Sequence, residues 1–216
     1  MSIADRISAI ELKDLLLSLA ALVIAFSVLI NGRRIPDFEM ILIITVGVGT
    51  GFLLHEMAHK FMALHFGYFA EYRANPMGLL FAVVASFAGF IFAAPGAVMI
   101  SKPAATQAFY MQDPFSQEEL RREIKKETLW ISLAGPMTNI TLTIFFFLAL
   151  ILAPSSSTAA MAANFALFIN LTLAAFNLIP IGPLDGKKIY DSNRTVWLLV
   201  GLPTILIALP VYFGIL

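Results

Sequence analysis

The sequence predicts an all-α polytopic membrane protein with about five transmembrane helices and a re-entrant, partly β membrane-embedded segment. Three observations predict this fold class. Of the 216 residues, 59% are hydrophobic and 13% are charged, whereas soluble domains carry about 25% charged residues. Several apolar runs are long enough to cross a bilayer. One further apolar stretch is broken by glycine and proline, so we expect it to enter the membrane without forming a regular span.

The expected spans are apolar runs separated by turns or polar segments. A mixed-charge amino terminus without a small-residue cleavage signal leads into the first run, so we expect a retained span and not a removed signal peptide. The five runs together predict a single membrane domain over residues 1–216. They cover residues 15–30, 40–66, 129–153, 161–179 and 195–216.

The re-entrant segment is expected over residues 68–100. Its first part, residues 68–74, alternates in the manner of a short strand. Residues 78–100 are apolar but are interrupted by Gly89 and by Pro95 with its neighbouring glycine. A membrane crossing here would give six spans. The distribution of lysine and arginine satisfies the positive-inside rule either way, so charge alone does not decide.

The only long polar segment covers residues 101–128, and we expect it on the cytoplasmic side. Ser116 is followed three residues later by Glu119, which is the pattern of a helix capping box. The sequence therefore predicts a helix that starts near Ser116 and leads into the third span.

The second apolar run contains His55-Glu56-x-x-His59. Residues four apart lie on one face of a helix, so both imidazoles can bind one metal ion. Two neutral imidazoles suit zinc, and a carboxylate beside an open coordination position suits the activation of water. The alternative is two histidines packed between helices. It is disfavoured because ionisable groups in a membrane helix are costly.

A metal held by two histidines needs a third protein ligand. His65 lies about 240° round the helix from His59 and so faces elsewhere. Asp185 is the aspartate that ends an apolar run amid glycine and proline, while the other aspartates lie in polar segments. With five spans, the helices carrying His59 and Asp185 cross in the same direction and their side chains reach similar depths. This reasoning favours five spans plus a re-entrant segment.

Three motifs together resemble the site-2 protease family of intramembrane zinc metalloproteases. They are His55-Glu56-x-x-His59, Asn177-Leu-Ile-Pro180-x-x-Pro183-Leu-Asp185-Gly186 and Gly135-Pro-Met-Thr-Asn139. The resemblance covers roughly residues 40–190 and implies a catalytic core of that extent. It implies hydrolysis of peptide bonds within or near the transmembrane segments of membrane proteins. It also implies that a substrate strand pairs with the re-entrant segment.

The resemblance assigns roles to individual residues. It implies one zinc ion per chain, bound by His55, His59 and Asp185, with Glu56 as the general base. Asn139 and Asn177 are candidates for stabilising the oxyanion or holding the substrate backbone, and each could equally form a hydrogen bond between helices.

The expected partners are a membrane-embedded protein substrate and the lipid bilayer. We expect a multi-pass protein of the cell membrane, with the active site toward the cytoplasmic side. The net charge of zero gives no reason to expect a nucleic-acid partner.

The main alternative is a transporter or channel in which His55, His59 and Asp185 form a cation site along a pathway. It does not account for Glu56 beside the first histidine, and the sequence has no evident inverted repeat. The chain has no cysteine, which excludes thiol nucleophiles and disulfides.

Overall fold

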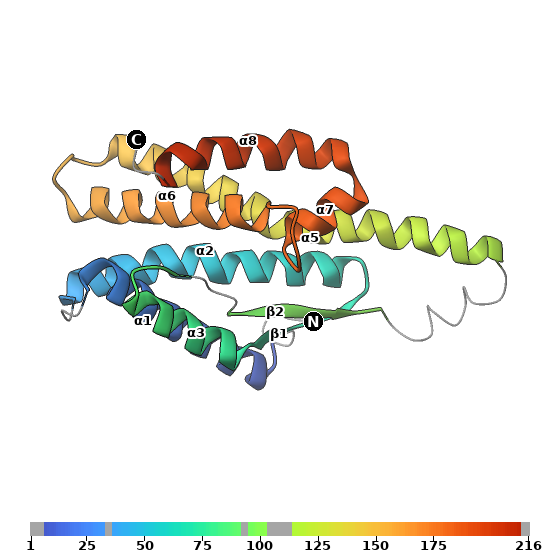
Figure 1. Cartoon of the computed structure of the whole chain (residues 1–216), viewed down its shortest axis with the longest axis horizontal. Coiled ribbons are helices and arrows are strands. Elements are labelled where there is room, and N and C mark those ends of the chain that lie inside the picture. The colour runs from blue at the N-terminus through green and yellow to red at the C-terminus, as the bar shows by residue number, and fades with distance from the viewer. Residues whose placement is uncertain (1–6, 33–35, 92–94, 103–113, 213–216) are drawn as a thin grey trace.

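The computed structural model describes residues 7–32, 36–91, 95–102 and 114–212. Within them the chain is mostly helical, with one two-stranded sheet (Figure 1). Parts of three predicted segments lie outside the described residues, namely 92–94, 103–113 and 213–216. The elements are α1 (Ala9–Asn31), α2 (Phe38–His65), β1 (Phe69–Ala74), α3 (Pro76–Phe87), β2 (Gly96–Ser101), α5 (Pro114–Leu152), α6 (Thr158–Asn177), α7 (Asp185–Ser192) and α8 (Arg194–Tyr212).

Four of these helices, α1, α2, α5 and α6, are long and apolar enough to cross a membrane. Polar caps mark where helices begin: Ser8, Asp37 and Ser157 each accept a hydrogen bond from a backbone N–H in the first turn of α1, α2 and α6. The apolar part of α8 is shorter. The chain therefore has the features of a membrane protein, and the fifth span stays a prediction.

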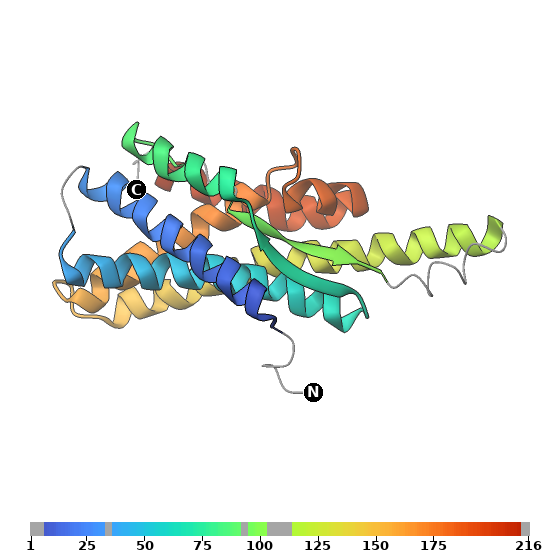
Figure 2. The same cartoon turned by 90° about the horizontal axis from the view of Figure 1, so that it is seen from below.

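Helices α2 and α6 run in one direction, and α1, α5 and α8 run in the opposite direction (Figures 1 and 2). Helix α2 lies at the centre, packed against α5 and α6 on one side and α1 on the other. Glycines permit the close approach of α6. A Cβ built on Gly47 would lie 2.6 Å from the Phe165 ring, and one on Gly51 would lie 2.9 Å from Leu173. Small residues at such contacts are typical of membrane helix pairs.

The predicted strand at residues 68–74 is confirmed as β1, and it pairs antiparallel with β2. Phe69 lies opposite Ser101, and Ala74 lies opposite Gly96. After β1 and α3, the chain therefore comes back alongside β1 as strand β2. Between the strands lies α3, whose 12 residues extend about 18 Å, less than a hydrocarbon core of about 30 Å. Helix α3 is thus too short to cross the core by itself, and the re-entrant path of the chain stays a prediction.

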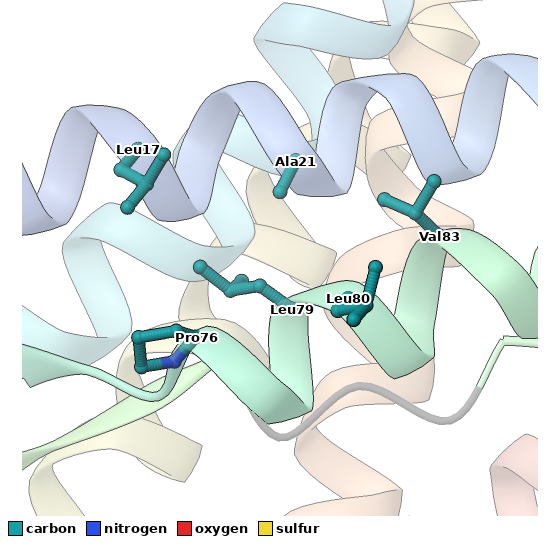
Figure 3. A pocket seen from close by; sticks show the side chains of 6 residues that line it. All are labelled: Leu17, Ala21, Pro76, Leu79, Leu80 and Val83. Carbon is teal, nitrogen blue, oxygen red and sulfur yellow. The ribbon is translucent and has the colours of Figure 1, made fainter.

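Helix α3 packs on α1 and leaves an apolar hollow between the two helices (Figure 3). Its wall carries no charged side chain, in keeping with a lipid-facing position. The lining residues are Leu17, Ala21, Pro76, Leu79, Leu80 and Val83.

A hydrogen bond and an ion pair to one glutamate connect the two ends of the sheet to α5. The Tyr68 hydroxyl donates to Glu127 Oε2 at 2.6 Å, and Lys102 Nζ lies 2.9 Å from the same oxygen. Burial and this hydrogen bond raise the pKa of Tyr68, so its hydroxyl stays protonated and continues to donate. The residues just before β1 and just after β2 are thus held at one point on α5.

The predicted helix that starts near Ser116 and leads into the apolar run at residues 129–153 is confirmed as α5, one helix of 39 residues from Pro114. Nothing in its polar half breaks a helix, and Glu118 pairs with Arg122 one turn later. Helix α5 therefore projects beyond the other helices at one end (Figure 1). The polar residues after Asp185 form a short helix, α7, that was not expected.

Candidate metal centre

His55 and His59 lie one turn apart on α2, and both are buried. Their Nε2 atoms are 3.0 Å apart, so both imidazoles point to the same place. This is the arrangement that the four-residue spacing predicts. The burial comes from α5 and α6, which pack on this part of α2.

Asp185 completes the cluster from a distant part of the sequence. Its Oδ2 lies 2.9 Å from His59 Nε2 and 3.5 Å from His55 Nε2. The sequence predicted that Asp185 ends the apolar helix. In the structure α6 ends at Asn177, and Asp185 is the first residue of α7. The structure thus brings together the three residues that the sequence selected.

A tight turn between α6 and α7 presents Asp185 to the histidines. A Cβ built on Gly186 would lie 2.1 Å from the backbone oxygen of Leu178, so only glycine fits there. The Trp197 indole on α8 donates from Nε1 to that same oxygen at 2.8 Å. Helix α8 therefore helps to hold the turn that carries Asp185.

The outer nitrogens of both imidazoles also have partners. His59 Nδ1 lies 2.7 Å from the Ile131 carbonyl oxygen, and His55 Nδ1 lies 3.3 Å from Asn139 Oδ1. A histidine that binds a metal through Nε2 carries its proton on Nδ1 and donates it to such an acceptor. Both acceptors come from α5, so this helix orients the two rings.

Asn139 is fully buried beside His55. The amide atom facing His55 is also 3.3 Å from the backbone oxygens of Gly51 and Gly135. A nitrogen in this place would donate to both carbonyls, whereas an oxygen accepts from His55 Nδ1. Metal binding through Nε2 favours the oxygen. Asn177 donates to the Leu173 carbonyl of its own helix at 3.0 Å. Neither contact tests the predicted oxyanion role.

Glu56 is partly buried on the helix that carries the histidines. Its carboxylate lies within electrostatic range of His55, His59, Asp185 and Lys188. It accepts no hydrogen bond from the described part of the chain. Its oxygens are therefore available to a water molecule or a substrate.

Comparisons with known proteins bear on the class of reaction. The chain is 34% identical to a protein of Methanocaldococcus jannaschii named "Putative zinc metalloprotease MJ0611", over 203 residues that cover 93% of each chain. It is 30% identical to "Putative zinc metalloprotease YwhC" of Bacillus subtilis over 171 residues, 70% of this chain and 68% of that relative. The chain belongs to this zinc metalloprotease family. No protein-family model matches it, and no solved structure matches it.

The side chains of this zinc metalloprotease fit one zinc ion. His55, His59 and Asp185 each offer one ligand atom, all within 4.8 Å of one another. Tetrahedral ligands at about 2 Å from zinc lie about 3.3 Å apart, close to the 2.9–3.5 Å observed. Two imidazoles and a carboxylate leave the fourth position open, as in catalytic zinc sites.

Gly135 leaves the room that the ion needs. A Cβ built there would lie 2.3 Å from His59 Nε2 and 2.6 Å from His55 Nε2. The role of Gly135 was not predicted, although one of the three motifs begins with this residue. The contributions of Ile131 and Trp197 were also missed. They depend on contacts between helices far apart in the sequence, for which no single-sequence signal exists.

Proposed function

We propose that this protein is an intramembrane zinc metalloprotease of the site-2 type, which hydrolyses peptide bonds within or near transmembrane segments of membrane proteins. The observation that carries the proposal is the depth of the metal centre. His59 and His55 lie six and ten residues before the last residue of α2, or about 9 and 15 Å along the helix. Apolar helices of membrane-spanning length surround them. Such a site can act on a bond that lies below the membrane surface.

The chain's own residues provide acid–base chemistry at this site. A zinc ion held by His55, His59 and Asp185 would polarise a carbonyl group and lower the pKa of water toward 7. Glu56 takes up the proton of the attacking water and delivers it to the leaving nitrogen. The charges of zinc, Asp185 and Glu56 sum to zero, which makes the site tolerable below the bilayer surface.

We expect the substrate to pair with β2. In the β1–β2 register, Val98 and Ile100 lie opposite Tyr72 and Ala70. These are non-hydrogen-bonded pairs, because the two kinds of pair alternate along an antiparallel ladder. Asn75 and Pro95, three positions beyond Tyr72 and Val98, form a hydrogen-bonded pair with an N–H···O bond of 2.8 Å. The backbone groups of Val98 and Ile100 therefore point away from β1. Within the described residues no hydrogen bond reaches this edge. An unwound substrate segment could add there as a strand.

The proposal includes the five-span topology and a site toward the cytoplasm. Helices α2 and α6 run in the same direction, which supports five spans (Figure 1). The metal centre lies toward the end of the bundle from which the polar half of α5 projects. That half carries Arg121, Arg122, Lys125 and Lys126, and cytoplasmic segments are rich in such residues.

The variant Glu56→Gln tests the catalytic role. We expect it to lose cleavage of a membrane-embedded test substrate by at least about 100-fold. Bound zinc should stay near that of the wild type, because Glu56 is not a ligand. The measurement is product formation in proteoliposomes, with zinc content determined on the same sample. Retained cleavage would refute the role of Glu56. Ion flux through the wild type without any cleavage would favour the transporter.

A further inference from the structure

The metal-binding helix carries a charged residue that the proposed chemistry does not use. Lys60 directly follows His59 and forms an ion pair with Glu11 of α1. Both side chains are buried, with 1% and 0% of their surface exposed. A buried ion pair adds little stability over well-packed apolar residues, because both charges must be desolvated. Its presence beside a metal ligand therefore calls for another role.

Glu11 also binds the backbone of β1. Lys60 contacts Glu11 Oε2, and Glu11 Oε1 accepts the Tyr72 N–H at 3.0 Å. One turn along α1, Asp14 Oδ2 accepts the Ala74 N–H at 3.3 Å. These two N–H groups belong to non-hydrogen-bonded pairs of the sheet and so point away from β2. Helix α1 thus occupies the edge of β1 that a neighbouring strand would use.

The two contacts of Glu11 connect the metal-binding helix to the sheet. Lys60 fixes Glu11 relative to His59, and Glu11 fixes Tyr72 in the middle of β1. The Tyr72 side chain is fully buried and its hydroxyl lies 2.9 Å from Ser18 of α1. Because β1 is hydrogen-bonded to β2, the position of β2 relative to the metal centre depends on this connection.

We propose that Glu11, held by Lys60, is a positioning residue that fixes the position of the sheet relative to the metal centre. It closes the outer edge of β1, so that a substrate strand can add only at β2, in register with the metal. The substrate in this inference is an extended polypeptide segment. The inference rests on the proposed proteolytic function, and it assigns to the first helix a part in substrate binding.

Two neutral double variants test the proposal, and both remove the ion pair without leaving a single buried charge. Glu11→Gln with Lys60→Met keeps an amide oxygen that can accept the Tyr72 N–H. Glu11→Leu with Lys60→Met removes this acceptor. The control is Glu118→Gln with Arg122→Gln, an exposed ion pair on the projecting half of α5.

We expect the leucine variant to raise KM for a membrane-embedded substrate about tenfold, with zinc content unchanged. The glutamine variant loses the contact with Lys60 but keeps an acceptor for the Tyr72 N–H, so we expect a smaller rise in KM, about threefold. The control should keep the KM of the wild type. If the ion pair only stabilised the fold, both double variants would have a lower unfolding temperature, and the KM of the zinc-loaded protein would not change. That result, or equal KM values in the two double variants, would overturn the proposal.

Hydrogen exchange of the wild type gives a second test that needs no variant. The Tyr72 amide should exchange at least about tenfold more slowly than the Val98 amide on the open edge of β2. Equal rates at the two amides would overturn the assignment of α1 to the edge of β1. If the wild type cleaves no membrane-embedded substrate, the proposed function fails, and the exchange experiment still decides the position of Glu11.

Discussion

At the scale of single residues, the metal centre depends as much on a missing side chain as on the ligands present. His55, Glu56 and His59 could be found from the sequence because helical periodicity is a local property. Asp185 could be selected because few acidic residues border an apolar run. Gly135 could not be assigned a role, because the reason for a glycine there lies in α2, about 80 residues earlier in the chain.

Gly135→Ala should abolish zinc binding although it removes no ligand. The added methyl group would lie within 2.6 Å of both Nε2 atoms, where the ion would lie. We expect zinc affinity to fall by at least about 100-fold. Asp185→Ala, which lacks one of the three ligands, is the reference variant and should show a comparable loss. Gly49→Ala is the matched control, because a Cβ there has no neighbour closer than 3.8 Å. Metal analysis of the purified variants checks the prediction, and full zinc in Gly135→Ala would contradict it.

At the scale of elements, the sequence predicted the apolar helices, the first strand and the return of the chain after Pro95. These follow from apolar runs, alternation and breaking residues, all of which are local. The short helix α7 was missed because its eight residues are polar and follow a stretch rich in glycine and proline. The part played by α1 in holding β1 was also missed, because Glu11 and Tyr72 are 61 residues apart.

Helix α8 should influence the metal centre without contacting it. Trp197→Phe removes the Nε1 donor that binds the Leu178 oxygen in the turn before Asp185. A lost hydrogen bond of this kind costs about 1 kcal/mol, so zinc affinity should fall about fivefold. Trp130→Phe, at a half-exposed tryptophan of α5, serves as the control. Zinc titration against a competing chelator measures both variants, and equal affinities would show that α8 does not hold the turn.

At the scale of the whole molecule, the metal centre lies among apolar helices that are long enough to cross a membrane. The five-span topology predicts that the two ends of the re-entrant segment lie on one side of the membrane. The chain has no cysteine, so single cysteines can be labelled with an impermeant reagent without background.

Cysteines in place of His65 at the end of α2 and Glu118 on the projecting half of α5 should react from the same side. A cysteine in place of Ser156, in the connection between α5 and α6, should react from the opposite side. All three positions are exposed. Labelling of positions 65 and 118 from opposite sides would mean that the segment between them crosses the membrane, and the five-span topology would be wrong.

The most direct test of the central claim is to map the bond that the zinc-loaded protein cuts. Wild-type protein and a substrate with one transmembrane segment are reconstituted together, and the fragments are identified by mass spectrometry. We predict cleavage inside the segment, in the half nearer the cytoplasmic face, that a zinc chelator abolishes and added zinc restores. Cleavage confined to the soluble flanks, or no cleavage by protein that holds one zinc ion per chain, would contradict the account.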